Sequence, residues 1–151
     1  MKRQHLLKSM LCLILVLVCN VAWAALGNKT GTPENGKQYY IYADTYQGGA
    51  YVNRYLYNNN GTLALSTSID EMNSTYLWTC TVADGKHTFQ NVGDNTKWLG
   101  HKDLATSAYN FTLGKTNATH EGTTIWSDGA NRYLVTKNDG SKFDQAQNTY
   151  N

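Results

Sequence analysis

Residues 82–100 read VADGKHTFQNVGDNTKWLG, in which a turn rich in Gly, Asp and Asn separates two short apolar pieces. Residues 122–137 read GTTIWSDGANRYLVTK and repeat the same order of features. Aromatic residues and Thr favour strands, whereas Asn, Asp and Gly favour turns. Each segment therefore predicts a strand, a turn and a second strand, and their recurrence predicts a repeated structural unit.

A third copy of this unit, YYIYADTYQGGAYVNR, occupies residues 39–54. In each copy an apolar residue is followed by an aromatic–aliphatic pair: Ile41 by Tyr51-Val52, Phe89 by Trp98-Leu99, and Ile125 by Tyr133-Leu134. The distance to the second member of the pair is 11, 10 and 9 residues, and the units start 48 and 36 residues apart. We expect Asp44, Asp94 and Asp128 to lie in the three turns, where Asp bonds its own backbone.

Further apolar runs predict a closing strand for two of the units. These runs are YLWTCTV at residues 76–82 and AYNFTLG at residues 108–114. The first unit is longer because residues 57–75 add a loop and a strand at 62–66. Three units of about 40 residues, each of about four short strands, predict an all-β fold, the β-trefoil, whose units bury a common core and close a small barrel. Independent hairpins in a β-sandwich are the alternative, but a sandwich does not require a threefold repeat.

The third unit has no evident closing strand. The spacing in the other two units places this strand from residue 147 onward, and no apolar run follows before Asn151. We expect that the natural chain continues past this residue, and the alternative is that residues 25–37 substitute for the strand.

The N-terminus has the features of a signal peptide. Basic residues precede an apolar run at 10–24, which ends in the small-x-small motif Ala22-Trp23-Ala24. The run is shorter than the roughly 20 residues that span a bilayer. We expect residues 1–24 to be removed, 25–36 to form a linker and 37–151 to form a secreted β-trefoil domain without a membrane-inserted segment. A retained anchor and a lipoprotein acylated at Cys19 are alternatives.

Removal of residues 1–24 changes the charge and the cysteine count. Three basic residues leave, so ten basic residues face eleven acidic ones and the formal charge falls from +2 to −1. No Lys/Arg cluster remains, so nothing predicts a nucleic-acid or anionic-membrane partner. Cys80 is the one remaining cysteine, and we expect it to pack as a small apolar side chain in a strand.

The repeat resembles the ricin-type β-trefoil lectin family, particularly its secreted bacterial members. The features that carry the resemblance are Phe89 followed by Asn95-Thr96-Lys97-Trp98-Leu99, and the threefold recurrence from about Lys37 onward. The resemblance implies a non-enzymatic carbohydrate-binding module, of a kind often attached to glycan-degrading or adhesive proteins. The family's Gln-x-Trp motif is absent, and its sugar-binding Asp is replaced at the matching positions by Asn53, Gly100 and Val135.

The first unit carries the candidate carbohydrate site. Tyr51, Asn53, Tyr55 and Tyr57 alternate along AYVNRYLYN and are predicted to share one strand face. Aromatic rings cover the C–H faces of sugars, and amides bond their hydroxyl groups. Trp98 is a second aromatic candidate. The alternatives are a solvated strand face for the tyrosine row and packing at the barrel end for Trp98.

Other functions have less support in the sequence. The histidines at 87, 101 and 120 form no His-x-x-x-His pattern, and no Cys-x-x-Cys, P-loop, dinucleotide or Gly-x-Ser-x-Gly motif is present. We therefore expect no catalytic residues, metal or cofactor, and glycans as partners. One alternative is a protein-binding trefoil, such as an inhibitor or adhesin, that uses the loop at 58–74. Another is an accessory module linked to a catalytic domain.

Overall fold

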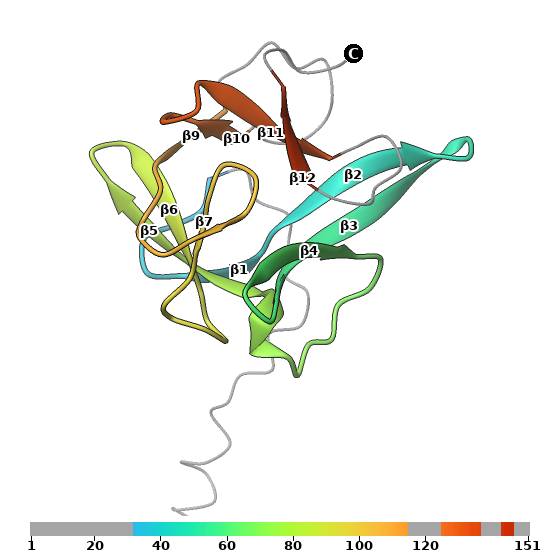
Figure 1. The fold of residues 1–151 in the computed structure, drawn as a ribbon, viewed down its shortest axis with the longest axis horizontal. Coiled ribbons are helices and arrows are strands. Elements are labelled where there is room, and N and C mark those ends of the chain that lie inside the picture. The colour runs from blue at the N-terminus through green and yellow to red at the C-terminus, as the bar shows by residue number, and fades with distance from the viewer. Residues whose placement is uncertain (1–31, 115–124, 137–142, 147–151) are drawn as a thin grey trace, which may run out of the picture.

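The computed structural model describes residues 32–114, 125–136 and 143–146, which form an all-β structure with antiparallel strand pairing (Figure 1). The predicted signal peptide lies outside these residues, and the predicted linker is described only from Thr32. Within the described ranges, no helix has the length and apolar character needed to cross a membrane.

The described strands belong to two sheets. The nine-stranded sheet contains β1 (Gln38–Tyr40), β5 (Leu77–Ala83), β6 (Lys86–Asn91), β7 (Trp98–Leu99), β8 (Leu104–Ala105), β9 (Phe111–Leu113), β10 (Ile125–Ser127), β11 (Arg132–Thr136) and β12 (Phe143–Ala146). The three-stranded sheet contains β2 (Tyr42–Gln47), β3 (Ala50–Asn59) and β4 (Thr62–Ser66), and a single 3₁₀ turn, η1 (Ser74–Tyr76), leads into β5.

The order of the large sheet follows the chain. Its strands run β1-β5-β6-β9-β10-β11-β12, and β7 and β8 form a branch from β6. The β5–β6 hairpin is the longest pairing in this sheet and sets Cys80 opposite Phe89 and Trp78 opposite Asn91. Over the described residues the sheet does not close into a barrel.

The predicted strand–turn–strand units are present in all three places, as β2–β3, β6–β7 and β10–β11. The added strand predicted at 62–66 is β4, and the predicted closing strands correspond to β5 and β9. The prediction for Asp44 was wrong, because this residue lies within β2 opposite Asn53, and the turn instead begins at Gly48. Asp94 and Asp128 do lie in the connections between their strands. The predicted third closing strand, from residue 147 onward, lies outside the described residues.

The apolar core joins the two sheets. Side chains from both sheets are buried in it: Leu56, Trp78, Cys80, Phe89, Leu99 and Phe111, each at most 3% exposed. Burial of one such large side chain stabilises the fold by roughly 1.5–3 kcal/mol. The indole Nε1 of Trp78 donates to the Leu56 carbonyl over 3.3 Å. This buried N–H group, which links the two sheets, therefore has a hydrogen-bond partner. Burial raises the pKa of the Cys80 thiol, which agrees with the packing role expected for it.

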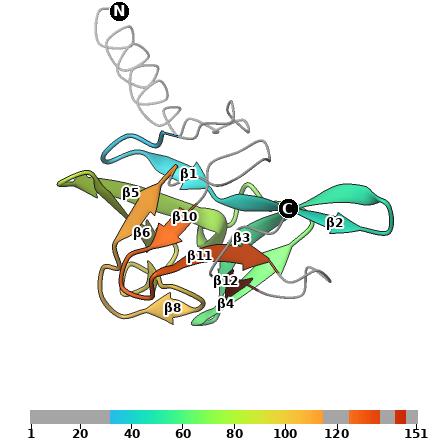
Figure 2. The same ribbon diagram turned by 90° about the horizontal axis from the view of Figure 1, so that it is seen from above.

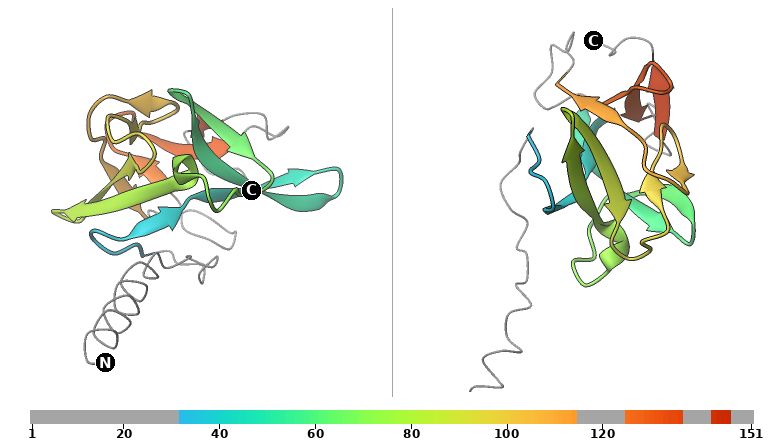
Figure 3. Two further views of the ribbon diagram at one scale, coloured as in Figure 1. Left: turned by 90° about the horizontal axis from the view of Figure 1, so that it is seen from below. Right: turned by 90° about the vertical axis from the view of Figure 1, so that its left-hand side faces the viewer.

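The β2–β3 hairpin projects from the rest of the molecule, as Figures 2 and 3 show from two further directions. Its two-residue turn consists of Gly48 and Gly49, with φ of 59° and 92°. Glycine adopts such left-handed angles without steric cost, and this turn geometry matches the twist of a hairpin. The sequence at the turn therefore places a long aromatic strand at the edge of the molecule.

Candidate functional site

Burial along β3 alternates at the inner end of the strand, while residues 52–55 are all half-buried. Leu56 and Asn58 are 1% and 4% exposed, whereas Tyr51 is 65% exposed. Because successive side chains of a strand point to opposite faces, Tyr51, Asn53 and Tyr55 share the face opposite Leu56. We call the set Tyr42, Tyr51, Asn53 and Tyr55 the tyrosine face.

Tyr42 joins this face from the neighbouring strand. It stands directly opposite Tyr55 in the β2–β3 register, so both side chains lie on the same side of the sheet. Their rings are tilted by 48° with centroids 5.8 Å apart. The pair forms an angled aromatic surface next to Asn53, a half-buried residue whose amide can both donate and accept hydrogen bonds.

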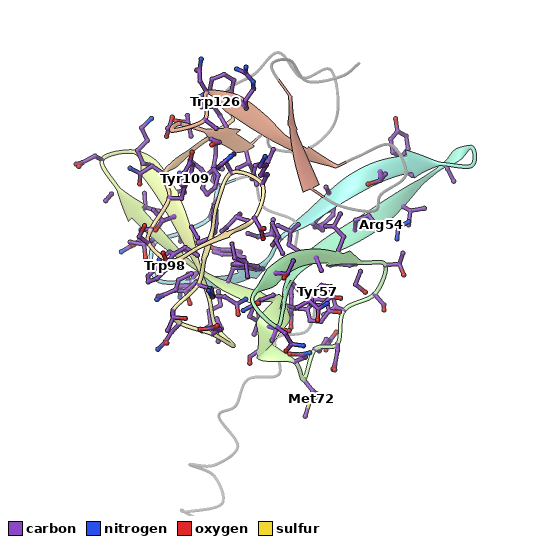
Figure 4. The ribbon with its side chains drawn as sticks, in the orientation of Figure 1. Arg54, Tyr57, Met72, Trp98, Tyr109 and Trp126 are labelled. Atoms are coloured by element: carbon purple, nitrogen blue, oxygen red, sulfur yellow. The ribbon has the colours of Figure 1, made fainter. Side chains whose placement is uncertain are left out.

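Tyr57 has a different role from the other tyrosines of β3. Its ring stacks on Tyr76 of η1, with centroids 4.7 Å apart and planes inclined by 14°. Tyr76 is only 9% exposed, so the stack belongs to the packed body of the molecule. In Figure 4, Tyr57 lies deeper in the body of the molecule than Arg54, which belongs to the same strand. The predicted row therefore divides into an outer part and a packing residue.

Trp98 lies apart from the tyrosine face. It belongs to β7, where it stands opposite Gln90 of β6 and Ala105 of β8, and it is half-buried. In Figure 4 it lies on one side of the molecule and Arg54 of the β3 hairpin on the other. The two predicted aromatic candidates therefore cannot contact one small ligand together.

The absence of the family's acidic residue in the second unit has a steric reason. Gly100 is buried, and a Cβ at this position would lie 2.6 Å from the Asp103 carbonyl oxygen. The Gly100 amide also donates to that oxygen over 2.9 Å. No acidic side chain fits there, so the second unit has no binding group at the position where the resemblance would place one.

A polar pocket of about 510 Å³ lies between three segments that the sequence did not bring together. The β3–β4 turn supplies Asn60, η1 supplies Thr75, and the β6–β7 connection supplies Asp94 and Lys97. Asn58 and the backbone of two glycines complete its lining. We keep the name polar pocket for this set.

The amide of Asn91 holds the three segments of the pocket in place. Asn91 is 1% exposed, and its Nδ2 donates to the carbonyls of Thr75 and Leu77 over 2.8 and 3.3 Å. Its Oδ1 accepts from the Asp94 amide over 3.0 Å and from Asn58 Nδ2 over 3.4 Å. All of its hydrogen-bonding groups are thus used inside the protein. An Asn shortly before a Gly-Asp turn is the one signal of this role that is visible in the sequence.

Close packing of the β6–β7 connection against η1 completes the pocket wall. The Gly93 amide donates to the Ser74 carbonyl over 3.1 Å, and a Cβ at Gly93 would lie 2.9 Å from the Thr75 backbone nitrogen. Only glycine permits this approach, because any larger residue would push η1 away. The pocket therefore depends on a backbone contact as well as on side chains.

A charged cluster elsewhere connects the second and third units. Lys86 Nζ lies 3.1 Å from Asp128 Oδ1 and donates to Thr112 Oγ1 over 2.7 Å, while Thr112 Oγ1 donates to the same carboxylate oxygen over 2.9 Å. The Lys86 side chain is 41% exposed, so solvent weakens the ion pair. The cluster ties β6, β9 and the β10–β11 turn together through Asp128 Oδ1, while Asp128 Oδ2 is buried without a hydrogen-bond partner among the described residues.

The described residues contain no group of three or more His, Cys, Asp or Glu side chains arranged to hold a metal ion. No protein family's sequence profile matches the chain, and no curated protein is similar to it in sequence. Both surfaces described above are therefore interpreted from their own chemistry.

Proposed function

We propose that the chain is a β-trefoil. The first support is the order of the large sheet, in which β1, β5, β6, β9 and β10 are consecutive neighbours. These are the first and closing strands of the successive units. Each unit also contains an antiparallel pair, β3–β4, β7–β8 or β11–β12, and in the first unit β2 pairs with β3 as well. One further strand between β10 and β1 would close the ring.

A repeated hydrogen bond gives the second support for this fold. Asn91 and Ser127 both stand two residues after the apolar residue of their unit, and both are buried. Asn91 Oδ1 accepts from the Asp94 amide over 3.0 Å, and Ser127 Oγ accepts from the Ala130 amide over 3.4 Å. The same bond, spanning three residues, begins the turn in both units, as expected of copies of one ancestral unit.

The proposed function is that of a secreted, non-enzymatic module that binds glycans through the tyrosine face and needs no cofactor. The observation that carries it is the row on the projecting hairpin, where Tyr51 is 65% exposed beside Asn53 and Tyr55. Aromatic surface on an edge element suits the C–H faces of sugar rings, and the Asn53 amide suits their hydroxyl groups. A face of this kind on a projecting hairpin fits a chain or surface glycan better than an enclosed small molecule.

A glycan array tests this function, with residues 25–151 as the probe and the double variant Tyr51→Ala, Asn53→Ala as its partner. We expect selective binding that weakens at least about tenfold in the double variant, the effect of losing about 1.4 kcal/mol of contact energy. The control is Met72→Ala, which removes an exposed side chain far along the chain from this face. A folded domain without any glycan signal, or equal binding by the double variant, would contradict the proposal.

One observation favours a second candidate, a protein-binding trefoil. Met72 is 75% exposed on the loop between β4 and η1, and a flexible thioether side chain is common at protein-binding surfaces. Under this alternative, Met72→Ala would weaken capture of the partner, and the double variant of the tyrosine face would bind it normally. The same three proteins therefore separate the two candidates.

A further inference from the structure

The polar pocket is a rigid feature of the fold. Its three walls are fixed by the hydrogen bonds of Asn91, by the Gly93–Ser74 backbone bond and by the bond from the Gly61 amide to Asn58 Oδ1, which is 2.7 Å long. Its volume of about 510 Å³ lies within the range of roughly 300–1,000 Å³ that small-molecule sites occupy. The site is therefore organised before any ligand arrives.

Asp94 supplies a carboxylate with unused acceptor capacity. The hydroxyl and the amide of Thr96 donate to Asp94 Oδ1 over 2.7 and 3.0 Å. These bonds, with smaller contributions from Lys97 and from the Asn58 amide, hold the pKa of Asp94 below its ordinary value. An ionised carboxylate accepts about four hydrogen bonds, so at least one acceptor site remains for a ligand.

Two hydrogen-bond donors, Lys97 and Asn60, line the same pocket as this carboxylate. Lys97 forms no salt bridge among the described residues, and its ammonium group can donate three hydrogen bonds. Asn60 is exposed at the rim, where its φ of 50° fixes the turn, and its amide can donate two more. One negative and one positive group give the lining no net charge.

We propose that the polar pocket binds one neutral polyhydroxylated molecule, of the size of a monosaccharide or sugar alcohol, with adjacent hydroxyl groups donating to Asp94 and accepting from Lys97 and Asn60. Hydrogen bonds between hydroxyl groups and a carboxylate are short and about twice as strong as neutral ones. The site shares no residue with the tyrosine face, so it does not depend on the function proposed above.

Other ligand classes fit the lining less well. No aromatic or large apolar side chain lines the pocket. An apolar ligand would therefore cover the polar groups of the lining without forming hydrogen bonds to them, which costs binding free energy. Asp94 repels anions, and a single carboxylate next to an ammonium group is a poor cage for calcium, which takes six to eight oxygen ligands. Neutral hydroxyl-rich ligands use both the donors and the acceptor.

Amide chemical-shift titration of the isotope-labelled full chain tests the proposal, with D-glucose, D-galactose and D-mannitol as separate probes at millimolar concentration. We expect at least one probe to give saturable shifts at the amides of Gly61, Gly93 and Thr96. Tyr51→Ala should leave these shifts unchanged, which separates this site from the tyrosine face. The absence of a saturable shift at these amides with all three probes would overturn the proposal.

The decisive variant is Asp94→Asn. Asparagine keeps an Oδ1 acceptor for Thr96, so the turn is preserved while the charge is lost. We expect at least a tenfold weaker affinity, with Lys97→Met and Asn60→Gly giving smaller losses. Glycine tolerates the left-handed angle at residue 60, so the last variant removes only the amide side chain. Unchanged affinity in Asp94→Asn would refute the site. If that protein does not fold, unchanged affinity in both other variants would refute it.

Discussion

The tyrosine face and the polar pocket are built in opposite ways. The tyrosine face takes most of its residues from one strand, β3, on a hairpin that projects from the molecule. The polar pocket takes its residues from three segments, and the Asn58–Asn91 bond between two of them spans 33 residues of sequence. A single strand can lose one exposed side chain and keep its shape, whereas the pocket depends on contacts between its segments, including those of the buried Asn91 amide. We therefore expect single substitutions to be tolerated on the tyrosine face and to be destabilising at the residues that hold the polar pocket together.

Asn91→Ala is expected to have the largest effect. The substitution leaves the partly buried Thr75 carbonyl and Asp94 amide without their Asn91 partner, whereas the Leu77 carbonyl keeps its bond from the Val92 amide. One such unsatisfied group costs about 1–3 kcal/mol. We expect a loss of about 3 kcal/mol in the free energy of unfolding, measured by urea denaturation. Asn59→Ala, an exposed neighbour of the pocket, is the matched control and should change little. Equal stability of Asn91→Ala and the native chain would show that the fold does not need the hydrogen bonds of the Asn91 amide.

The second prediction divides the tyrosines of β3. Tyr57→Ala removes the stack on Tyr76 and should cost about 1–2 kcal/mol of stability, measured in the same way. Tyr51→Ala removes a side chain that is 65% exposed and should cost less than about 0.5 kcal/mol. The reverse order of the two losses would mean that the division of this strand into packing and binding residues is wrong.

A third, smaller effect concerns mild acid. Desolvation lowers the pKa of His87, whose Nδ1 is buried without a hydrogen-bond partner among the described residues. The unfolded chain therefore takes up a proton first, near the ordinary value of about 6.5. Stability should be complete above that pH and fall gradually below it, by the linkage of proton binding to folding. Thermal melts from neutral to mildly acid pH measure the slope, and His87→Gln should flatten it.

The smallest expected effect is a lack of pH dependence at the polar pocket. Because the pKa of Asp94 is held below its ordinary value, chiefly by Thr96, the carboxylate stays ionised above about pH 3.9. Ligand affinity at the pocket should therefore be constant across the mildly acid range in which His87 weakens the fold. The stabilising contribution of Asp94 is present above that pH and is lost only as the pH falls through its lowered pKa. Affinity that falls between neutral and mildly acid pH would point to a different titrating group.

Most of the secondary structure was predictable because it follows from short-range chemistry. Alternation in AYVNRYLYN predicted the two faces of β3, and the turn residues predicted where the hairpins reverse. Asp44 was misplaced because Gly48 and Gly49 set the turn of the first unit, and their freedom at positive φ outweighs the turn preference of Asp.

The polar pocket is held rigid by contacts between segments that are distant in the sequence, and for that reason it could not be predicted from the sequence. Its residues are ordinary turn formers in the sequence, and they acquire a common function only when η1 packs against the β6–β7 connection. Stacking between Tyr57 and Tyr76 was missed in the same way, since nothing local links a strand residue to a 3₁₀ turn that follows a long loop.

The bond between Asn58 and Asn91 also has a consequence for the order of assembly. Hairpins such as β2–β3 and β5–β6 close over a few residues and form early, because short loops lose little entropy on closure. Contacts over 33 residues form later and slow the approach to the native state. A chain emerging during synthesis would therefore present its tyrosine hairpin before its pocket exists, and the pocket would be complete only in molecules that have finished folding through β6 and the connection beyond it.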